Sequence, residues 1–265
     1  METTARVIEV FSSIQGEGIY VGQPHLFVRF WDCNMACRYC DTDYRGPYQE
    51  YTEGELLEEV RRRILEEGPH HAVSLTGGEP LLWWRFLKRW LPPLKGLGQR
   101  VYLETNGTLP AALSEVLPWV DIVAMDIKPP TATADRSVWK EHEAFLRMAA
   151  QAKRDLFVKI VVTPQTSSSE LQQAFQLVAS VDAEIPVVLQ PVTPPPALFA
   201  DVSPANRSKG STGLRPVKAG GGVTPWGAVQ EPPDERQLRE WRNQAGRTLR
   251  EVRIIPQVHR VLGMR

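Results

Sequence analysis

The stretch CNMACRYC at residues 33–40 decides how the rest of the chain is interpreted, because it contains all three cysteines, Cys33, Cys37 and Cys40. An odd number of thiols cannot pair completely within one chain. Three thiolates this close repel one another unless a cation neutralises them, so we expect a metal centre. A structural zinc needs four protein ligands, and none of the five histidines has a paired spacing with the cysteines. A four-iron cluster held at three corners, with one iron open, fits better; zinc remains the alternative.

The composition predicts a folded protein whose net charge creates no strong electrostatic field around it. The chain has 265 residues, of which 42% are hydrophobic and 23% are charged. Its 31 basic and 31 acidic residues cancel, which argues against a nucleic-acid or anionic membrane partner. No apolar run reaches the ~18 residues of a membrane span, and the start lacks the pattern of a secretory leader. We therefore expect a cytoplasmic protein.

Short β-rich runs alternate with helical patterns from about Leu26 to Gln190. The helix at 52–67 begins at a cap, Thr52, with Glu55 three residues later as in a capping box. Regular alternation predicts a parallel sheet, open or curled into a barrel, in a single α/β domain over 1–265. The expected strands are 25–30, 72–76, 101–105, 122–126, 156–162, 187–190 and 252–255, and the expected helices are 52–67, 83–91, one near 111, 138–152, 169–180 and 234–249.

The segment 194–233 breaks this alternation. It contains PPP at 194–196, GGG at 220–222 and PP at 232–233, with little apolar periodicity. Such a composition buries little surface, so we expect a flexible insertion near the C-terminus. A functional lid is the alternative.

Polar motifs follow several of the expected strands, where the chemistry of a parallel barrel gathers. The motif TGGEP at 76–80 has two glycines that let a ligand approach the backbone, and Glu79 to orient it. ETNGT at 104–108, MDIKPP at 125–130 and QPVT at 190–193 occupy corresponding places. Each alone is an ordinary loop, but their shared position favours one site.

The cysteine spacing, with three and then two intervening residues, together with the GGE of 77–79 resembles the radical S-adenosylmethionine (SAM) superfamily. The resemblance implies a partial (β/α)6 TIM-like barrel. It also implies a [4Fe-4S] cluster whose open iron chelates SAM and whose electron cleaves SAM to a deoxyadenosyl radical. The implied SAM contacts are Tyr39, Cys40, Asp41, Gly78, Asp126, Ile127, Lys128, Gln190, Pro191, Val192 and Thr193.

The motif QGEG at 15–18, followed by Arg29 and by Asp41-Thr42 after the last cysteine, resembles the 7-carboxy-7-deazaguanine synthase family. The resemblance covers about residues 7–192 and the final tail. It implies a carbon–nitrogen lyase that converts 6-carboxy-5,6,7,8-tetrahydropterin to 7-carboxy-7-deazaguanine with loss of ammonia, in the 7-deazapurine (queuosine) pathway that feeds tRNA modification. Two alternatives stay open: another radical SAM enzyme, such as a glycyl-radical activase, and a zinc- or cluster-stabilised binding module.

The same resemblance implies the remaining site residues and partners. Arg29 suits a carboxylate, because its planar fork can bind it bidentately. Thr42 matches a magnesium ligand, and a hydroxyl oxygen suits that hard cation. A flavodoxin-like electron donor and a homodimer are also implied. The implied substrate contacts are Ile14, Gln15, Gly16, Glu17, Arg29, Thr76, His259 and Arg265.

Overall fold

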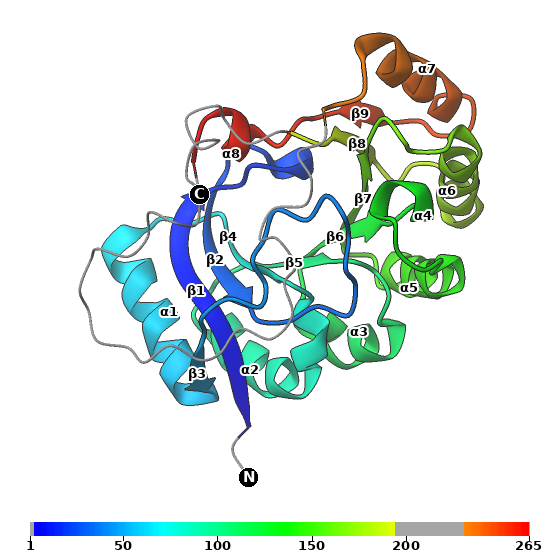
Figure 1. Cartoon of the computed structure of the whole chain (residues 1–265). Coiled ribbons are helices and arrows are strands. Elements are labelled where there is room, and N and C mark those ends of the chain that lie inside the picture. The colour runs from blue at the N-terminus through cyan, green and yellow to red at the C-terminus, as the bar shows by residue number, and fades with distance from the viewer. Residues whose placement is uncertain (1–2, 194–230, 265) are drawn as a thin grey trace.

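The computed structural model describes residues 3–193 and 231–264 (Figure 1). Its one sheet has nine strands in the order β3-β1-β2-β4-β5-β6-β7-β8-β9. The strands are β1 (Thr4–Ile14), β2 (Pro24–Phe30), β3 (Gln49–Thr52), β4 (Ala72–Gly77), β5 (Val101–Thr105), β6 (Ile122–Ile127), β7 (Asp155–Val162), β8 (Val187–Pro191) and β9 (Val252–Ile254). The α-helices are α1 (Glu53–Glu67), α2 (Trp84–Gly96), α3 (Pro110–Val116), α4 (Pro130–Thr133), α5 (Trp139–Gln151), α6 (Ser168–Val181), α7 (Glu235–Ala245) and α8 (Val258–Val261). Three 3₁₀ turns are η1 (Gly18–Tyr20), η2 (Pro80–Trp83) and η3 (Leu117–Trp119).

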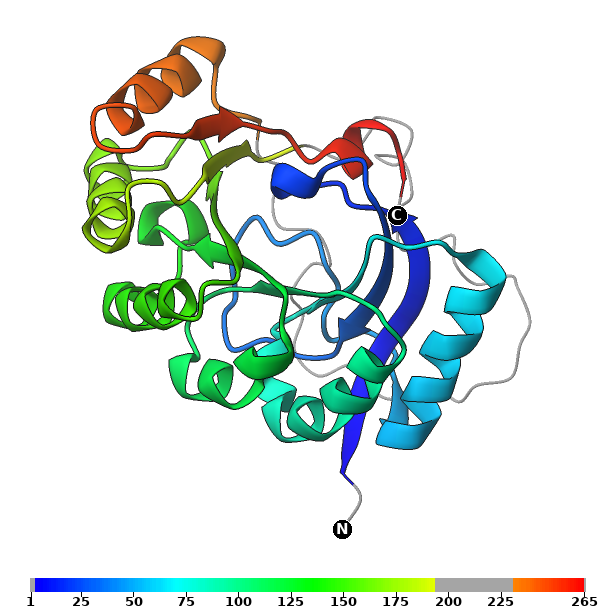
Figure 2. The same ribbon diagram turned by 180° about the vertical axis from the view of Figure 1, so that it is seen from behind.

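The parallel part of the sheet confirms the expected α/β fold. Strands β2, β4, β5, β6, β7 and β8 pair in parallel in sequence order, and β9 adds to β8 in the same sense. The sheet curves strongly, and α1, α2, α3, α5 and α6 cover its outer face (Figures 1 and 2). Within the described residues its edges are β3 and β9, so it forms a partial barrel of six β/α units. All carboxyl ends of these strands therefore meet at one end of the curved sheet.

Helix α1 forms where its sequence predicts it. The Thr52 hydroxyl accepts from the Glu55 backbone N–H while the Glu55 carboxylate accepts from the Thr52 backbone N–H, which completes the capping box. Leu56 and Val60 form the buried face of the helix. Gly68 follows the last turn and donates its N–H to the Ile64 carbonyl.

Two expected element boundaries are wrong. Helix α2 continues past Leu91 through two prolines to Gly96, because burial of Leu94 compensates for the missing N–H donors. Helix α7 ends at Ala245 rather than at Leu249, and Gly246 is its C-cap residue.

The N-terminal part of the chain forms a long strand. Strand β1 runs as far as Ile14 and is antiparallel to both β2 and β3. Of the expected insertion 194–233, all but the last three residues lie outside the described part.

The core has two layers, and the inner one positions the site. The larger layer fills the space between the sheet and its helices. The smaller layer lies on the concave face, where Tyr102, Phe157 and Val188 pack against Ile19 and Tyr20 of η1. These strand residues lie near the amino ends of their strands, so η1 fills that half of the concave face. The carboxyl half is left to the cysteine loop and its surroundings.

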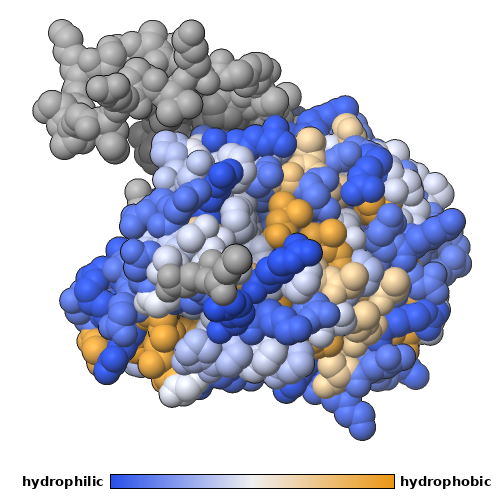
Figure 3. All heavy atoms as spheres, turned by 90° about the horizontal axis from the view of Figure 1, so that it is seen from below, coloured by the Kyte–Doolittle hydropathy of each residue, from blue (hydrophilic) through white to orange (hydrophobic). Residues whose placement is uncertain are grey.

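The helices carry their polar sides outward. On the face in Figure 3 hydrophilic residues predominate, and hydrophobic ones form separate groups. Among the described residues, no helix combines the length and the apolar character that crossing a bilayer requires.

Candidate active site

The three cysteines lie in the loop that follows β2, as expected. This loop is fixed to α4 and the turn after it: the Ala36 backbone N–H donates to Asp135 Oδ2 at 2.7 Å, and the Arg38 N–H donates to the Thr133 carbonyl at 2.8 Å. All three thiols are free and half-buried. Thiolates are the usual ligands of iron–sulfur clusters, whereas a structural zinc ion needs a fourth protein ligand.

The chemistry of these thiols also fits a cluster. Burial raises the pKa of Cys33 to about 11 and that of Cys40 to about 12, and it raises the pKa of Cys37 as well. The positive charge of Lys128 lowers these three pKa values, but by less than burial raises them. The thiols therefore become thiolates at neutral pH only with a bound cation, which the irons of a cluster supply.

The GGE motif locks β4 and β5 against the cysteine loop. Gly78 lies so close to this loop that a Cβ there would meet the Asp32 carbonyl oxygen at 1.8 Å. The buried Glu79 carboxylate accepts from Leu81 N, Thr105 Oγ1 and Asn106 N. Burial outweighs these donors and raises the pKa of Glu79 to about 7.

Asn106, directly after β5, connects Glu79 to the cysteine loop. Its side-chain amide donates to Asn34 Oδ1 at 2.8 Å and lies 3.8 Å from Cys33 Sγ. The ends of β2, β4 and β5 are thereby fixed around one corner of the cysteine triad.

Unpartnered buried polar atoms mark a ligand site on the other side of the cysteine loop. Both amide atoms of Gln190, at the end of β8, and the Tyr39 hydroxyl are buried with no hydrogen-bond partner. Lys128 Nζ binds Asp126 Oδ2 at 2.7 Å and lies 5.4 Å from the centre of the Tyr39 ring. Because buried polar groups are normally paired, these atoms are the candidates for contacts with a polar ligand.

A second group of polar side chains lies deeper on the concave face. Gln15 is 2% exposed, and its side-chain amide donates to Glu104 Oε1 at 2.7 Å. The Thr76 hydroxyl donates to Glu104 Oε2 at 2.6 Å. Arg29 binds Glu9 at 2.9 Å and reaches the Thr42 hydroxyl at 3.4 Å. Because Arg29 and Thr76 are paired neighbours on β2 and β4, donors, acceptors and a guanidinium lie close together in this group.

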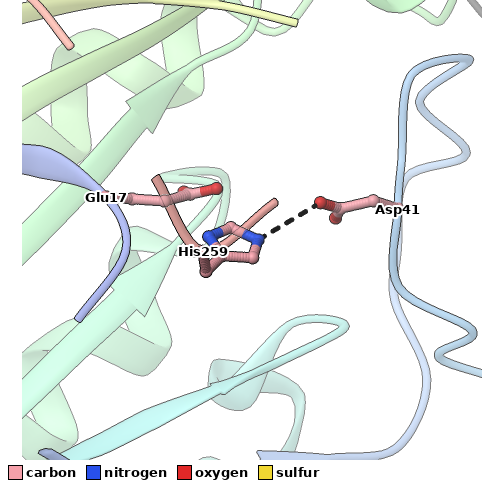
Figure 4. Close-up of side chains that lie close together, drawn as sticks. All are labelled: Glu17, Asp41 and His259. Carbon is pink, nitrogen blue, oxygen red and sulfur yellow. Dashed lines mark ion pairs between the residues drawn. The ribbon is translucent and has the colours of Figure 1, made fainter. Parts of the chain in front are cut away.

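The C-terminal tail packs against the N-terminal loop. The Val258 N–H donates to the Gly16 carbonyl at 2.9 Å, and a Cβ at Gly16 would collide with the His259 side chain. In Figure 4 the His259 ring lies between Glu17 and Asp41, with its Nε2 3.8 Å from Asp41 Oδ2. Burial disfavours the charged ring, but Asp41 and Glu17 together raise the pKa of His259.

These three side chains could hold a metal ion by distance alone, since their ligand atoms lie within 4.8 Å of one another. Their charges are already balanced, however. Lys159 pairs with Glu17, and Arg260 lies 3.6 Å from Asp41. Despite the burial of Glu17, the Lys159 charge holds the Glu17 pKa far below its usual value. The group therefore does not need a cation for stability.

The structure places the other expected site residues as follows. Pro191, Val192 and Thr193 follow Gln190 at the end of β8, and Ile14 ends β1. Ile127 packs into the core between sheet and helices, so only its backbone can reach a ligand. Arg265 lies outside the described residues.

Lys159 and Gln257 were missed, and Glu104 was expected only as part of the ETNGT motif at 104–108. Glu104 and Lys159 interrupt otherwise apolar strands, and a lone charge in such a strand was the available signal. Gln257 gave none. Its amide donates to Glu17 Oε1 at 3.0 Å and to Asp41 Oδ2 at 2.9 Å across more than 200 residues of sequence.

Comparison with known proteins identifies the family of this chain. Residues 32–178 match the family model of the radical SAM superfamily. The chain is therefore a radical SAM protein, a class defined by an iron–sulfur cluster and SAM. A 7-carboxy-7-deazaguanine synthase of Geobacter sulfurreducens is 38% identical and is covered over 97% of its length by 98% of this chain. One of Methanothermobacter thermautotrophicus is 32% identical, with 98% of each chain covered. The chain belongs to the 7-carboxy-7-deazaguanine synthase family.

A solved structure agrees on the fold. The crystal structure of QueE from Escherichia coli superimposes with a TM-score of 0.52 at 19% identity, covering 72% of this chain and 85% of that one. The family membership favours the synthase over the glycyl-radical activase and over a binding module.

Proposed function

We propose that this protein converts 6-carboxy-5,6,7,8-tetrahydropterin to 7-carboxy-7-deazaguanine with release of ammonia, as a carbon–nitrogen lyase of 7-deazapurine biosynthesis. The observation that carries the proposal is the gathering of polar side chains at the carboxyl ends of the parallel strands. The three-cysteine loop follows β2 and the unpartnered Gln190 lies at the end of β8, and the hydrogen-bonded side chains of Gln15, Glu104 and Arg29 lie in the same curved sheet or next to it. A heterocycle with a carboxylate fits these hydrogen-bonded side chains, and its reacting carbon would face the cysteine loop.

The residues present fit both cofactors of the superfamily. Cys33, Cys37 and Cys40 would hold the [4Fe-4S] cluster, which when bound supplies the electron for reductive cleavage of SAM. The buried Tyr39 hydroxyl and the Gln190 amide have free hydrogen-bonding capacity toward SAM. The further SAM contacts that we propose are Asp41, Gly78, Asp126, Lys128, Thr193 and the backbone of Ile127, Pro191 and Val192.

The substrate side offers what a carboxylated pterin needs. The Gln15 amide and the Glu104 carboxylate can pair with the polar edge of the ring, and such groups reject ligands that leave them unpaired. Arg29 lies 3.4 Å from the Thr42 hydroxyl. A substrate carboxylate could meet the guanidinium there together with a Mg²⁺ ion held by Thr42. We also propose substrate contacts from Ile14, Gly16, Glu17, Thr76, His259 and Arg265.

The remaining proposals rest on the family resemblance. We propose a flavodoxin-like electron donor, a homodimer and a cytoplasmic location. We also propose a single radical SAM domain over 1–265 that carries an insertion at 194–233.

Product identity tests the proposed activity. The reconstituted protein is incubated without oxygen with the carboxytetrahydropterin, SAM, Mg²⁺ and dithionite, and the mixture is analysed by mass spectrometry. We expect 7-carboxy-7-deazaguanine and ammonia from the wild type and neither from Cys37→Ala. Cleavage of SAM with an unchanged pterin would overturn the proposed reaction and leave the superfamily assignment standing.

A further inference from the structure

Lys159 is a buried cation inside the barrel that belongs to neither expected ligand set. It lies in β7 among apolar neighbours, and its side chain is 11% exposed. Its amine pairs with Glu17 from the N-terminal loop and lies 3.4 Å from Asp126 Oδ1 at the end of β6. The lysine therefore bridges one carboxylate on the substrate side and one on the SAM side.

The contacts continue from both carboxylates to the cysteine loop. Asp126 binds Lys128 at 2.7 Å, and Lys128 lies over the Tyr39 ring. On the other side Glu17 accepts from Gln257, which also donates to Asp41. Since Tyr39 and Asp41 flank Cys40, this chain of contacts leaves the metal loop and returns to it through Lys159.

Lys159 supplies the positive charge that lies between the carboxylates of Glu17 and Asp126. Without this amine, two buried carboxylates would share a low-dielectric space with one fewer cation, and breaking a buried ion pair is strongly unfavourable. Burial disfavours the charged amine, but Asp126 and Glu17 more than offset this and raise the pKa of Lys159 above its usual value. A permanently charged amine suits positioning rather than proton transfer.

We propose that Lys159 is a positioning residue that holds Glu17 toward the substrate and Asp126 toward SAM in a fixed relation, so that SAM cleavage is coupled to correct substrate binding. This inference rests on the proposed function. Glu17 is the acceptor through which Lys159 acts on the substrate, and Asp126 is the one through which it acts on SAM.

The test compares Lys159→Met with a matched control, Lys95→Met. Lys95 also pairs with a carboxylate, Asp121 at 2.6 Å, but on the outer helix α2. Substrate affinity is measured by anaerobic calorimetry on the reconstituted protein with SAM and without reductant, so that no turnover occurs. We expect Lys159→Met to weaken substrate binding at least about tenfold, a loss of about 1.4 kcal/mol, and Lys95→Met to leave it unchanged. The melting temperature of each variant reports folding separately.

A double-substitution cycle separates positioning from general damage. If Lys159 acts on the substrate through Glu17, Lys159→Met should change substrate affinity less than about twofold in a Glu17→Gln background. With reductant, Lys159→Met should release several times more deoxyadenosine per product than the wild type. If Lys159→Met does not fold, Lys159→Gln replaces it, with the same direction expected.

The outcomes distinguish the inference from the proposed function. A wild type that does not bind the pterin overturns the proposed function and the inference with it. A wild type that binds, with Lys159→Met equal to it in substrate affinity and in deoxyadenosine per product, overturns the inference alone. An undiminished effect in the Glu17→Gln background would also overturn it.

Discussion

Gly78→Ala introduces one methyl group at the tightest backbone contact next to the metal loop. A Cβ at this position would lie 1.8 Å from the carbonyl oxygen of Asp32, 2.4 Å from its carbonyl carbon and 3.0 Å from Cys33 N. All three are backbone atoms, so no side-chain rotation relieves the collision. Reaching even 3.0 Å from the oxygen requires the two segments to separate by about 1.2 Å.

The cost follows from what that separation breaks. Gly78 N donates to the Phe30 carbonyl at 3.1 Å, and Glu79 N donates to the Asp32 carbonyl at 2.9 Å. Losing these bonds costs about 1 kcal/mol each, and overpacking a tight site adds about 1–3 kcal/mol. We therefore expect Gly78→Ala to lower the free energy of unfolding by about 3–5 kcal/mol and, by displacing Cys33, to reduce cluster retention.

Urea unfolding of the metal-free protein and iron content after reconstitution measure the two effects. The matched control is Gly54→Ala in α1, where an added Cβ meets nothing within 4 Å. The control should be neutral or more stable by up to about 1 kcal/mol, with wild-type iron. A Gly78→Ala protein with the stability and iron content of the wild type would refute the reasoning.

Three further substitutions test other parts of the structure. Arg29→Lys should weaken substrate binding by about 10- to 100-fold, because a bidentate guanidinium contact is lost, while substrate-free SAM cleavage stays unchanged; equal substrate affinity in calorimetry would count against Arg29 as the carboxylate ligand. Glu104→Gln should weaken substrate binding about tenfold, because an amide nitrogen that cannot accept replaces one of the two carboxylate oxygens to which Gln15 and Thr76 donate; unchanged affinity would contradict this role. His25 is kept neutral, since burial and then the charge of a neighbouring histidine lower its pKa from 6.5 to about 3. Below pH 6.5 His25 is therefore protonated in the unfolded chain but not in the folded chain. As the pH falls from 6.5 to 3, this difference lowers the free energy of unfolding by about 1.4 kcal/mol per pH unit. In urea unfolding between pH 6.5 and 5, the free energy of unfolding of His25→Gln should fall less steeply with decreasing pH than that of the wild type. Equal slopes would contradict this prediction.

Local signals in the sequence predicted the elements that depend on neighbouring residues. The capping box of Thr52 and Glu55 is formed as expected, and the alternation of strands and helices predicted the six parallel β/α units. The cysteine spacing and the GGE motif lie at strand ends because a parallel sheet brings its carboxyl ends together.

Contacts between distant segments could not be predicted in the same way. Strand β1 depends on pairing with β2 and β3 on both sides, and its sequence alone does not specify either partner. The contacts of Gln257 with Glu17 and of Lys159 with Glu17 span 240 and 142 residues. Only the folded chain brings such side chains together. The sequence therefore predicted the cysteine loop more completely than the polar contacts of Glu17, Lys159 and Gln257.

The central claim is that Cys33, Cys37 and Cys40 hold an iron–sulfur cluster with one iron open to SAM. Electron paramagnetic resonance of the reduced, anaerobically reconstituted protein tests this most directly, with the metal content measured on the same sample. We expect about four irons per chain and a paramagnetic signal that changes when SAM is added, with neither feature in Cys37→Ala. One zinc per chain, no paramagnetic signal, or a signal that SAM leaves unchanged would contradict it.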